Sequence, residues 1–118
     1  MEPPIVLTID APRLDHSNAD AFSERLLAAL GENGSRHVIV DFTGVEAISS
    51  VGFRALVLAL KKSTAGDGAI VVSGLHGLAQ EAYEISKLDL AFHTFRTLEL
   101  AQRAFANGEI QAKTRPKT

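Results

Sequence analysis

The stretch "HVIVDF" at residues 37–42 limits the possible fold more than any other part of the chain. Val38, Ile39 and Val40 follow one another without a polar residue, so both faces of the strand that they predict are apolar. Such a strand is stable only when both faces of its sheet are covered. We therefore predict that residues 37–42 form an interior strand, with helices packed above and below it.

Strand and helix patterns alternate along the rest of the chain. Two more β-branched runs, "IVLTI" at 5–9 and "AIVVSG" at 69–74, predict strands, and "AFHTF" at 91–95 is a weaker candidate. The spacing of apolar residues predicts helices at residues 17–34, 50–62, 77–88 and 97–106. This alternation predicts one α/β domain at residues 1–110, with a central, mostly parallel mixed sheet of about four strands and four helices around it. Residues 111–118, "QAKTRPKT", are expected to be a flexible tail.

Local signals predict how individual helices begin and which way they face. Ser17, followed three residues later by Asp20, matches a capping box, which predicts that Ser17 caps the first helix. In the third helix, the spacing of Leu78, Ala82 and Ile85 predicts that these three side chains face the core.

The composition excludes several classes of site. The chain has no cysteine, which excludes disulfides, thiolate metal sites and cysteine nucleophiles. Its four histidines lack the spacing of metal ligands, and no glycine-rich phosphate loop is present. No group of residues matches a nucleophile motif. We therefore predict no catalytic residue, no metal site and no cofactor, and a protein that is not an enzyme.

Charge and hydropathy indicate where the protein acts. The net charge is -2 and no basic patch dominates, which argues against binding to nucleic acid. The N-terminus lacks the pattern of a signal peptide, and no run of about 18 apolar residues is present. These features predict a cytoplasmic protein that does not insert into a membrane.

Two adjacent serines stand at the start of the second predicted helix. The simplest interpretation of Ser49 and Ser50 is that one of them caps the helix, which contributes about 1 kcal/mol. The helical period adds a second interpretation, because it places Ser50 on a narrow stripe with Arg54, Val57 and Lys61 that is expected to face solvent. The remaining apolar residues of the helix are expected to be buried: Phe53, Ala55, Leu56, Leu58, Ala59 and Leu60.

The start of this helix suits a phosphate. A phosphate on Ser50 would meet the positive end of the helix dipole and the free amides of the first turn. Arg54, one turn further along, would pair with it. The sequence therefore indicates a site that phosphorylation could switch.

The segment at residues 38–62, "VIVDFTGVEAISSVGFRALVLALKK", resembles the signature of STAS domains, the family of bacterial anti-sigma factor antagonists. In that family an apolar strand ends in an acid, and a loop leads to an acid-Ser-x-Gly core and an apolar helix. Asp41 matches the strand-end acid, Ser50 the serine that is phosphorylated, and Gly52 the glycine. The resemblance extends over residues 5–105, and "RLDHSNADAFSERL" is similar to the strand-to-helix segment of the family.

The resemblance implies a binding protein that is switched by phosphorylation. Members of the family bind an anti-sigma factor that is also a serine kinase, which frees the sigma factor. The kinase uses ATP and magnesium to phosphorylate the serine, the complex dissociates, and a serine phosphatase restores the starting state. The partner face predicted here comprises Ser49, Ser50, Arg54, Val57 and Lys61 on the helix, and Asp15, Ser17 and Asn18 in the loop before the first helix.

Two departures from the family pattern leave alternatives open. Ser49 stands where the family usually has an acid, so Ser49 is an alternative acceptor. Only "MEPP" represents the additional first strand of the family, so that edge of the sheet is expected to be short or absent. One alternative function is a STAS protein that is not phosphorylated and serves as a scaffold or as an accessory subunit of a lipid-transport complex. The other is a small-molecule or nucleotide-binding domain of the same α/β class.

Overall fold

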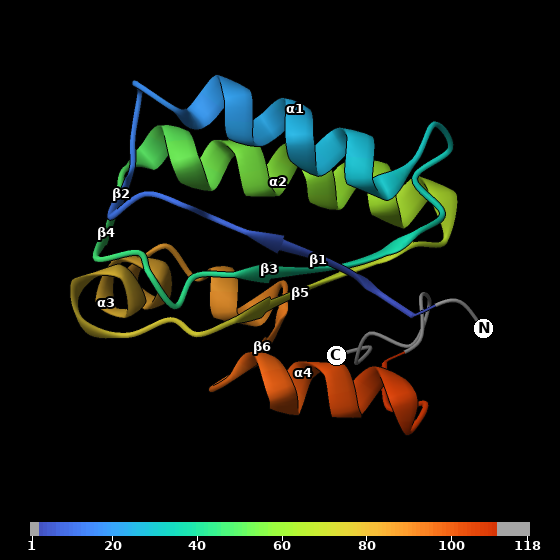
Figure 1. Ribbon diagram of the computed structural model, residues 1–118. Coiled ribbons are helices and arrows are strands. Elements are labelled where there is room, and N and C mark those ends of the chain that lie inside the picture. Colours follow the sequence, from blue (N-terminus) through green and yellow to red (C-terminus); the bar gives the residue numbers. More distant parts are fainter. Residues whose placement is uncertain (1–2, 111–118) are drawn as a thin grey trace.

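The computed structural model describes residues 3–110 as a layered α/β structure (Figure 1). The strands are β1 (Ile5–Thr8), β2 (Arg13–Leu14), β3 (His37–Asp41), β4 (Ala47–Ile48), β5 (Ala69–Ser73) and β6 (His93–Phe95). The helices are α1 (Ala19–Leu30), α2 (Ser50–Gly66), α3 (Gly77–Ile85) and α4 (Leu98–Ala106), with a 3-10 turn η1 (Leu88–Leu90) after α3. Four strands form the central sheet, in the order β1-β3-β5-β6.

Strand β3 is an interior strand, as its sequence predicts. It pairs with β1 on one side and β5 on the other, so that Val38 lies opposite both Ile5 and Ile70. Helices α1 and α2 cover one face of the sheet and α4 covers the other (Figure 1). Val38 and Val40 belong to the core beneath α1 and α2, whereas Ile39 belongs to the core beneath α4. The alternation of side chains along a strand therefore divides one apolar run between two cores.

The central sheet is wholly parallel within residues 3–110, rather than mixed. The strands predicted at 5–9, 69–74 and 91–95 correspond to β1, β5 and β6. Strand β1 forms an edge, and no strand of the described residues lies outside it. The tail predicted at 111–118 lies outside the described residues.

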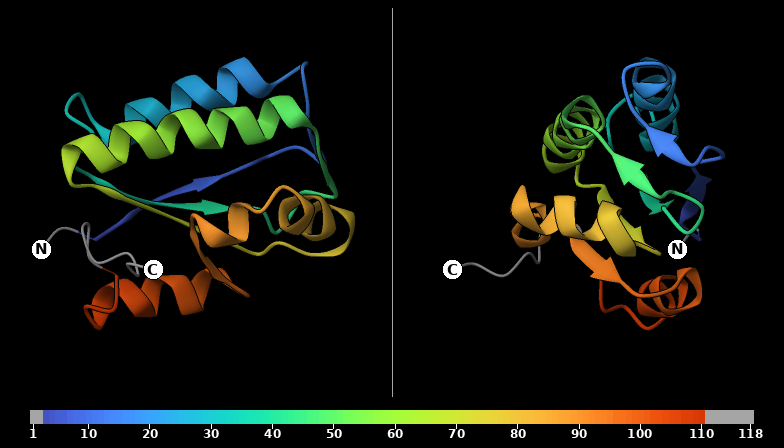
Figure 2. Two further views of the ribbon diagram at one scale, coloured as in Figure 1. Left: turned by 180° about the vertical axis from the view of Figure 1, so that it is seen from behind. Right: turned by 90° about the vertical axis from the view of Figure 1, so that its left-hand side faces the viewer.

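A second, two-stranded sheet has no counterpart in the sequence analysis. Strands β2 and β4 run parallel, with Arg13 opposite Ala47 and Leu14 opposite Ile48. Figure 2 shows this pair at the end of the molecule where α1 and α2 begin. The small sheet therefore holds the loop before α1 beside the loop before α2.

Two predicted helix boundaries differ from the structure. Asn18 is the N-cap residue of α1, and the Ser17 hydroxyl donates instead to Asp15 Oδ1 at 2.6 Å. The predicted capping box is therefore wrong, because the Ser17 hydroxyl donates its hydrogen bond to the Asp15 carboxylate and does not cap the helix. Helix α2 continues past residue 62 to Gly66, and Asp67 ends it in a left-handed conformation with φ of 67°.

The buried face of α3 also differs from the prediction. Leu78 and Ile85 are 70% and 79% exposed, and Ala82 is half-buried. The side chains that α3 buries are Ala79 and Tyr83. The prediction is wrong because the helix is turned so that its one aromatic ring, which buries more surface than a leucine, faces the core.

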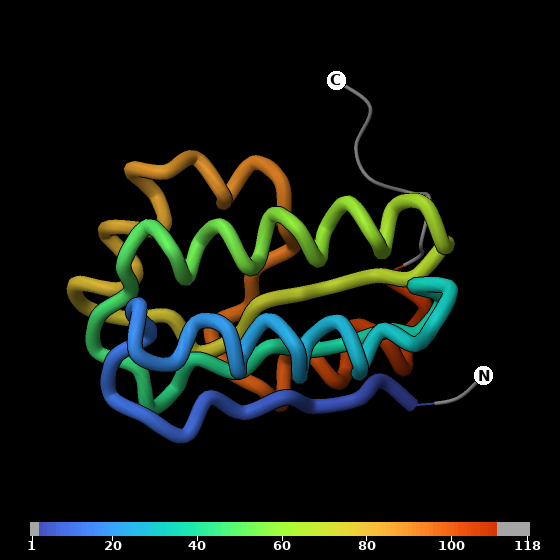
Figure 3. Tube along the Cα trace, turned by 90° about the horizontal axis from the view of Figure 1, so that it is seen from above, coloured from blue at the N-terminus to red at the C-terminus, as the bar shows by residue number. Residues whose placement is uncertain are grey.

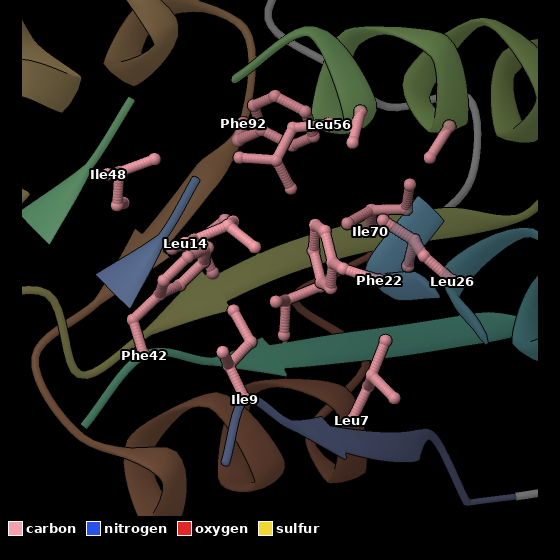
Figure 4. Close-up of a cluster of buried hydrophobic side chains, with 14 of the residues drawn as sticks. Leu7, Ile9, Leu14, Phe22, Leu26, Phe42, Ile48, Leu56, Ile70 and Phe92 are labelled. Carbon is pink, nitrogen blue, oxygen red and sulfur yellow. The ribbon is translucent and has the colours of Figure 1, made fainter. Parts of the chain in front are cut away.

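Helix α2 has a different neighbour on each of its two sides. Viewed from above, it lies between α1 and the segment that contains η1 (Figure 3). Figure 4 shows how these parts meet, with Phe22 of α1, Leu56 of α2 and Phe92 after η1 in one buried cluster. These neighbours decide which residues of α2 reach solvent.

Candidate partner-binding site

The first turn of α2 rests directly on the small sheet. Ser49 N donates to Leu14 O at 2.9 Å, which extends the pairing of β2 with β4 into the turn before the helix. A Cβ atom at Gly52 would lie 2.8 Å from Leu14 Cγ and 2.9 Å from Ile48 Cγ2. Those separations are too short for any side chain, so the glycine lets the start of α2 approach the small sheet.

The two serines lie in different environments. Ser49 is the N-cap residue, but its side chain makes no capping hydrogen bond, and its Oγ is buried without a partner in the described part of the chain. Ser50 is the first residue of α2 and is exposed. Interpreting Ser49 as a side-chain cap is therefore wrong, since only its backbone carbonyl accepts bonds from the first turn, from Gly52 N and Phe53 N.

The exposed side of α2 is shifted from the predicted stripe. Ser50, Arg54 and Lys61 are exposed, as predicted. Val57 is instead half-buried and packs against the core, whereas Leu58, which was expected to be buried, is 48% exposed. The helical period fixes the width of the exposed side but not its position, which is set by the packing of Val57 against the core cluster. Of the other residues predicted to be buried, three are buried and two are partly buried: Ala55, Leu56 and Ala59, and Phe53 and Leu60.

The loop before α1 is ordered by its own polar side chains. Asp15 N donates to Asn18 Oδ1 at 2.9 Å, and Asn18 Nδ2 donates to Arg13 O at 2.8 Å. Hydrogen bonds from the side chain and then the backbone amide of Ser17 hold the pKa of Asp15 below its usual value. The small sheet places this loop beside the serines, so the structure brings together the two parts of the predicted partner face.

A shallow groove of about 100 Å³ lies between the first halves of α1 and α2. Its lining residues are Ala19, Asp20 and Ser23 from α1, and Val51, Arg54, Ala55 and Leu58 from α2. No local pattern in the sequence marks the α1 side of this groove, because only the packing of α1 against α2 brings Asp20 near Arg54.

The family model described as the STAS domain matches residues 2–101. The chain is a STAS domain protein. The match contains the loop before α1, both serines and the groove, so the candidate site lies wholly within the STAS domain.

Known STAS proteins resemble this one in sequence and in structure. BtrV, a proposed anti-sigma factor antagonist of Bordetella bronchiseptica, is 32% identical over 92 residues, which is 78% of each chain. An anti-sigma-factor antagonist (STAS) domain protein from Planctomyces limnophilus superposes with a TM-score of 0.77 at 22% identity, over 86% of this chain and 89% of that one. The anti-sigma factor antagonist SpoIIAA in its unphosphorylated form gives 0.74 at 15% identity, over 93% and 94%. The two structures establish that the fold is that of a STAS domain.

The acid that ends β3 has a structural role in this STAS domain. Asp41 is 7% exposed, and its Oδ1 accepts hydrogen bonds from Thr43 Oγ1 at 2.6 Å and from Ser73 Oγ at 3.2 Å. Because Ser73 ends β5, the carboxylate ties two neighbouring strands together at their carboxyl ends. The sequence pattern identified this acid, and the structure shows that it links the ends of β3 and β5.

Two further kinds of site can be assessed over residues 3–110. No three side chains of the metal-binding types come together closely enough there to hold a metal ion. Among the described helices, none has the combined length and apolar character that crossing a membrane requires.

Proposed function

We propose that this STAS domain protein is a cytoplasmic anti-sigma factor antagonist that binds an anti-sigma factor with serine kinase activity. The kinase, with ATP and magnesium, phosphorylates Ser50 and thereby releases the protein, and a serine phosphatase restores it. The protein is a regulator and a substrate rather than an enzyme. The 32% identity to BtrV supports the class of function. The observation that carries the switch is the exposed Ser50 at the start of α2, beside the loop at residues 15–18.

The difference in burial favours Ser50 over Ser49 as the acceptor. A hydroxyl must lie in line with the γ-phosphate of ATP, so it has to be presented to the active site of the kinase. Ser49 Oγ is buried, and reaching it would require the start of α2 to open. Ser50 needs no such rearrangement, because it is exposed in the folded protein.

Phosphorylation would change the charge of the partner face strongly. A phosphate adds about -1.5 to -2 charges at pH 7. The first turn of α2 would stabilise this charge, and Arg54, which is exposed one turn further along, would pair with it. In the complex, the same charge would have to be removed from water at a packed interface, which opposes binding.

Leu58 provides a test of the partner face. Leu58→Asp is expected to weaken binding to the anti-sigma factor at least about tenfold, because it places a carboxylate on an exposed apolar contact. Its free energy of unfolding should change by no more than about 0.5 kcal/mol, since Leu58 is 48% exposed. Val57→Asp is the matched comparison and should destabilise the fold by more than about 1 kcal/mol, because Val57 packs against the core. Urea unfolding and a pull-down on the anti-sigma factor measure both effects, and normal binding by Leu58→Asp would remove α2 from the interface.

The experiment that tests the proposed function is incubation with the kinase-type anti-sigma factor of the host, ATP and magnesium. Mass spectrometry should then find phosphate on Ser50, and the complex should dissociate. One sequence feature favours a second function, a STAS scaffold that is not phosphorylated: Ser49 occupies the place of the family's acid. A stable complex with no phosphate on either serine would establish that second function instead.

A further inference from the structure

Helix α3 carries a row of apolar side chains that the fold leaves uncovered. Leu78 and Ile85 are 70% and 79% exposed, and the half-buried Ala82 lies between them on the same side of the helix. Leu90 follows on η1 and is 79% exposed. These are the three most exposed large apolar side chains of the described residues. Single exposed apolar residues are ordinary, but a row of them on one short segment is typical of an interaction surface.

The fold of this protein does not need the row. Helix α3 is anchored by other residues, Ala79 and Tyr83, which are 0% and 1% exposed. The Tyr83 hydroxyl also forms a 2.8 Å hydrogen bond with Thr94 Oγ1, which fixes the helix against the strand segment after η1. The exposed side of α3 is therefore free to serve another purpose.

The charges beside the row indicate what can cover it. Residues 77–91 contain three carboxylates, Glu81, Glu84 and Asp89, and one cation, Lys87, and all four side chains are exposed. Glu81 is three residues after Leu78 and four before Ile85, so it borders both on the helix surface. Within residues 3–110 no cation pairs with Glu81 or Glu84, and Glu84 accepts only a 3.4 Å hydrogen bond from Gln80. The row thus has an acidic border whose charge is unneutralised.

This combination of apolar row and acidic border disfavours three occupants. A second copy paired through the same helix would bring the carboxylates of both copies together. An anionic lipid surface would repel them as well. Residues 111–118 of this chain contain three cations but no large apolar side chain that could cover the apolar row.

We propose that the α3 surface, defined as Leu78, Glu81, Glu84 and Ile85, docks an amphipathic helix of a partner protein. That helix would have an apolar stripe, which covers the row, and lysine or arginine residues beside the stripe, which meet the glutamates. The docking site is on a different helix from Ser50 and does not depend on phosphorylation.

A pair of synthetic helical peptides tests this proposal. Both carry leucine at positions i, i+3, i+4 and i+7; one has lysine at the flanking positions and the other has glutamate. The lysine peptide should bind saturably in fluorescence anisotropy, and the amide NMR signals of α3 should shift. Ile85→Ser and Glu81→Lys should each weaken binding about tenfold. Leu100→Ser is the matched control, because Leu100 is a 42% exposed leucine on α4, and it should bind as the unchanged protein does.

Each other outcome overturns the proposal. Equal binding of the glutamate peptide would show that the acidic border plays no part. Unchanged binding by Ile85→Ser, or no saturable binding, would show that α3 is not the site. If the protein sediments as a dimer and Ile85→Ser abolishes the dimer, a second copy is the occupant. If the protein binds phosphatidylglycerol vesicles and Ile85→Ser abolishes that binding, a lipid surface is the occupant. The assays contain no kinase and use unphosphorylated protein, so their result is independent of the switch at Ser50.

Discussion

Ser50→Ala is expected to remain bound to the kinase-type anti-sigma factor when ATP and magnesium are added, whereas the unchanged protein is released. The alanine variant cannot acquire the charge that opposes the complex, so its affinity should stay within about twofold, while that of the unchanged protein falls at least about tenfold. Size-exclusion chromatography of the mixture before and after ATP measures the release. Ser49→Ala is the matched control and should be released normally, because the Ser49 hydroxyl is buried.

Two further variants examine the chemistry at the start of α2. Ser50→Asp should bind the partner poorly without ATP, although one carboxylate supplies less charge than a phosphate and gives a partial effect. Arg54→Ala should reduce the thermal stability of the phosphorylated protein more than that of the unphosphorylated protein, if Arg54 holds the phosphate. Phosphate found only on Ser49 would contradict the assignment, and normal release of Ser50→Ala would contradict the switch itself.

Gly52→Ala is expected to destabilise the fold by overpacking the start of α2. The new Cβ would lie 2.8 Å from Leu14 Cγ and 2.9 Å from Ile48 Cγ2, and Leu14 is fully buried, so neither neighbour can move away freely. Overpacking of this kind costs about 1–3 kcal/mol, which should lower the midpoint of urea unfolding. Because the strain acts on the first turn of α2, phosphorylation of Ser50 should slow as well.

The control for this variant is Gly44→Ala. The nearest atom to a Cβ at Gly44 is Ile9 O, at 3.9 Å, and Gly44 does not have a positive φ, so the substitution should be close to neutral.

A double variant separates the clash from a general effect on α2. Leu14→Ala alone should cost about 2–5 kcal/mol, and Gly52→Ala should cost less in its presence, because the clash with Leu14 is gone and only that with Ile48 Cγ2 remains. Equal costs of Gly52→Ala in both backgrounds would show that the close approach to Leu14 does not limit this position.

Several parts of the protein follow from the sequence because their signal is local. Three consecutive β-branched residues in "HVIVDF" require two covered faces, and β3 is indeed interior. The alternation of such runs with helical spacing leads to a parallel sheet layered with helices, and the pattern around Asp41, Ser50 and Gly52 leads to the STAS family. Each of these inferences depends on residues that are neighbours in the chain, so no tertiary contact was needed to make them.

Other parts were decided only by tertiary packing. Strands β2 and β4 are two residues long and pair across more than thirty positions, from Arg13 to Ala47, so no run in the sequence marks them. That pairing nonetheless places the loop before α1 beside the serines, of which Ser49 has a buried hydroxyl and Ser50 is exposed.

The orientation of α2 and α3 was decided in the same way. Apolar spacing predicts that a helix has a buried face, but the neighbours determine where that face lies. Val57 of α2 packs against the core while Leu58 remains in solvent, and the burial of Tyr83 turns Leu78 and Ile85 of α3 outward. The sequence alone therefore determined the layers of this STAS domain and the position of the candidate acceptor serine. Which apolar residues form its core and which form its surface depended on packing between segments distant in the chain, because burial is a property of both partners in a contact.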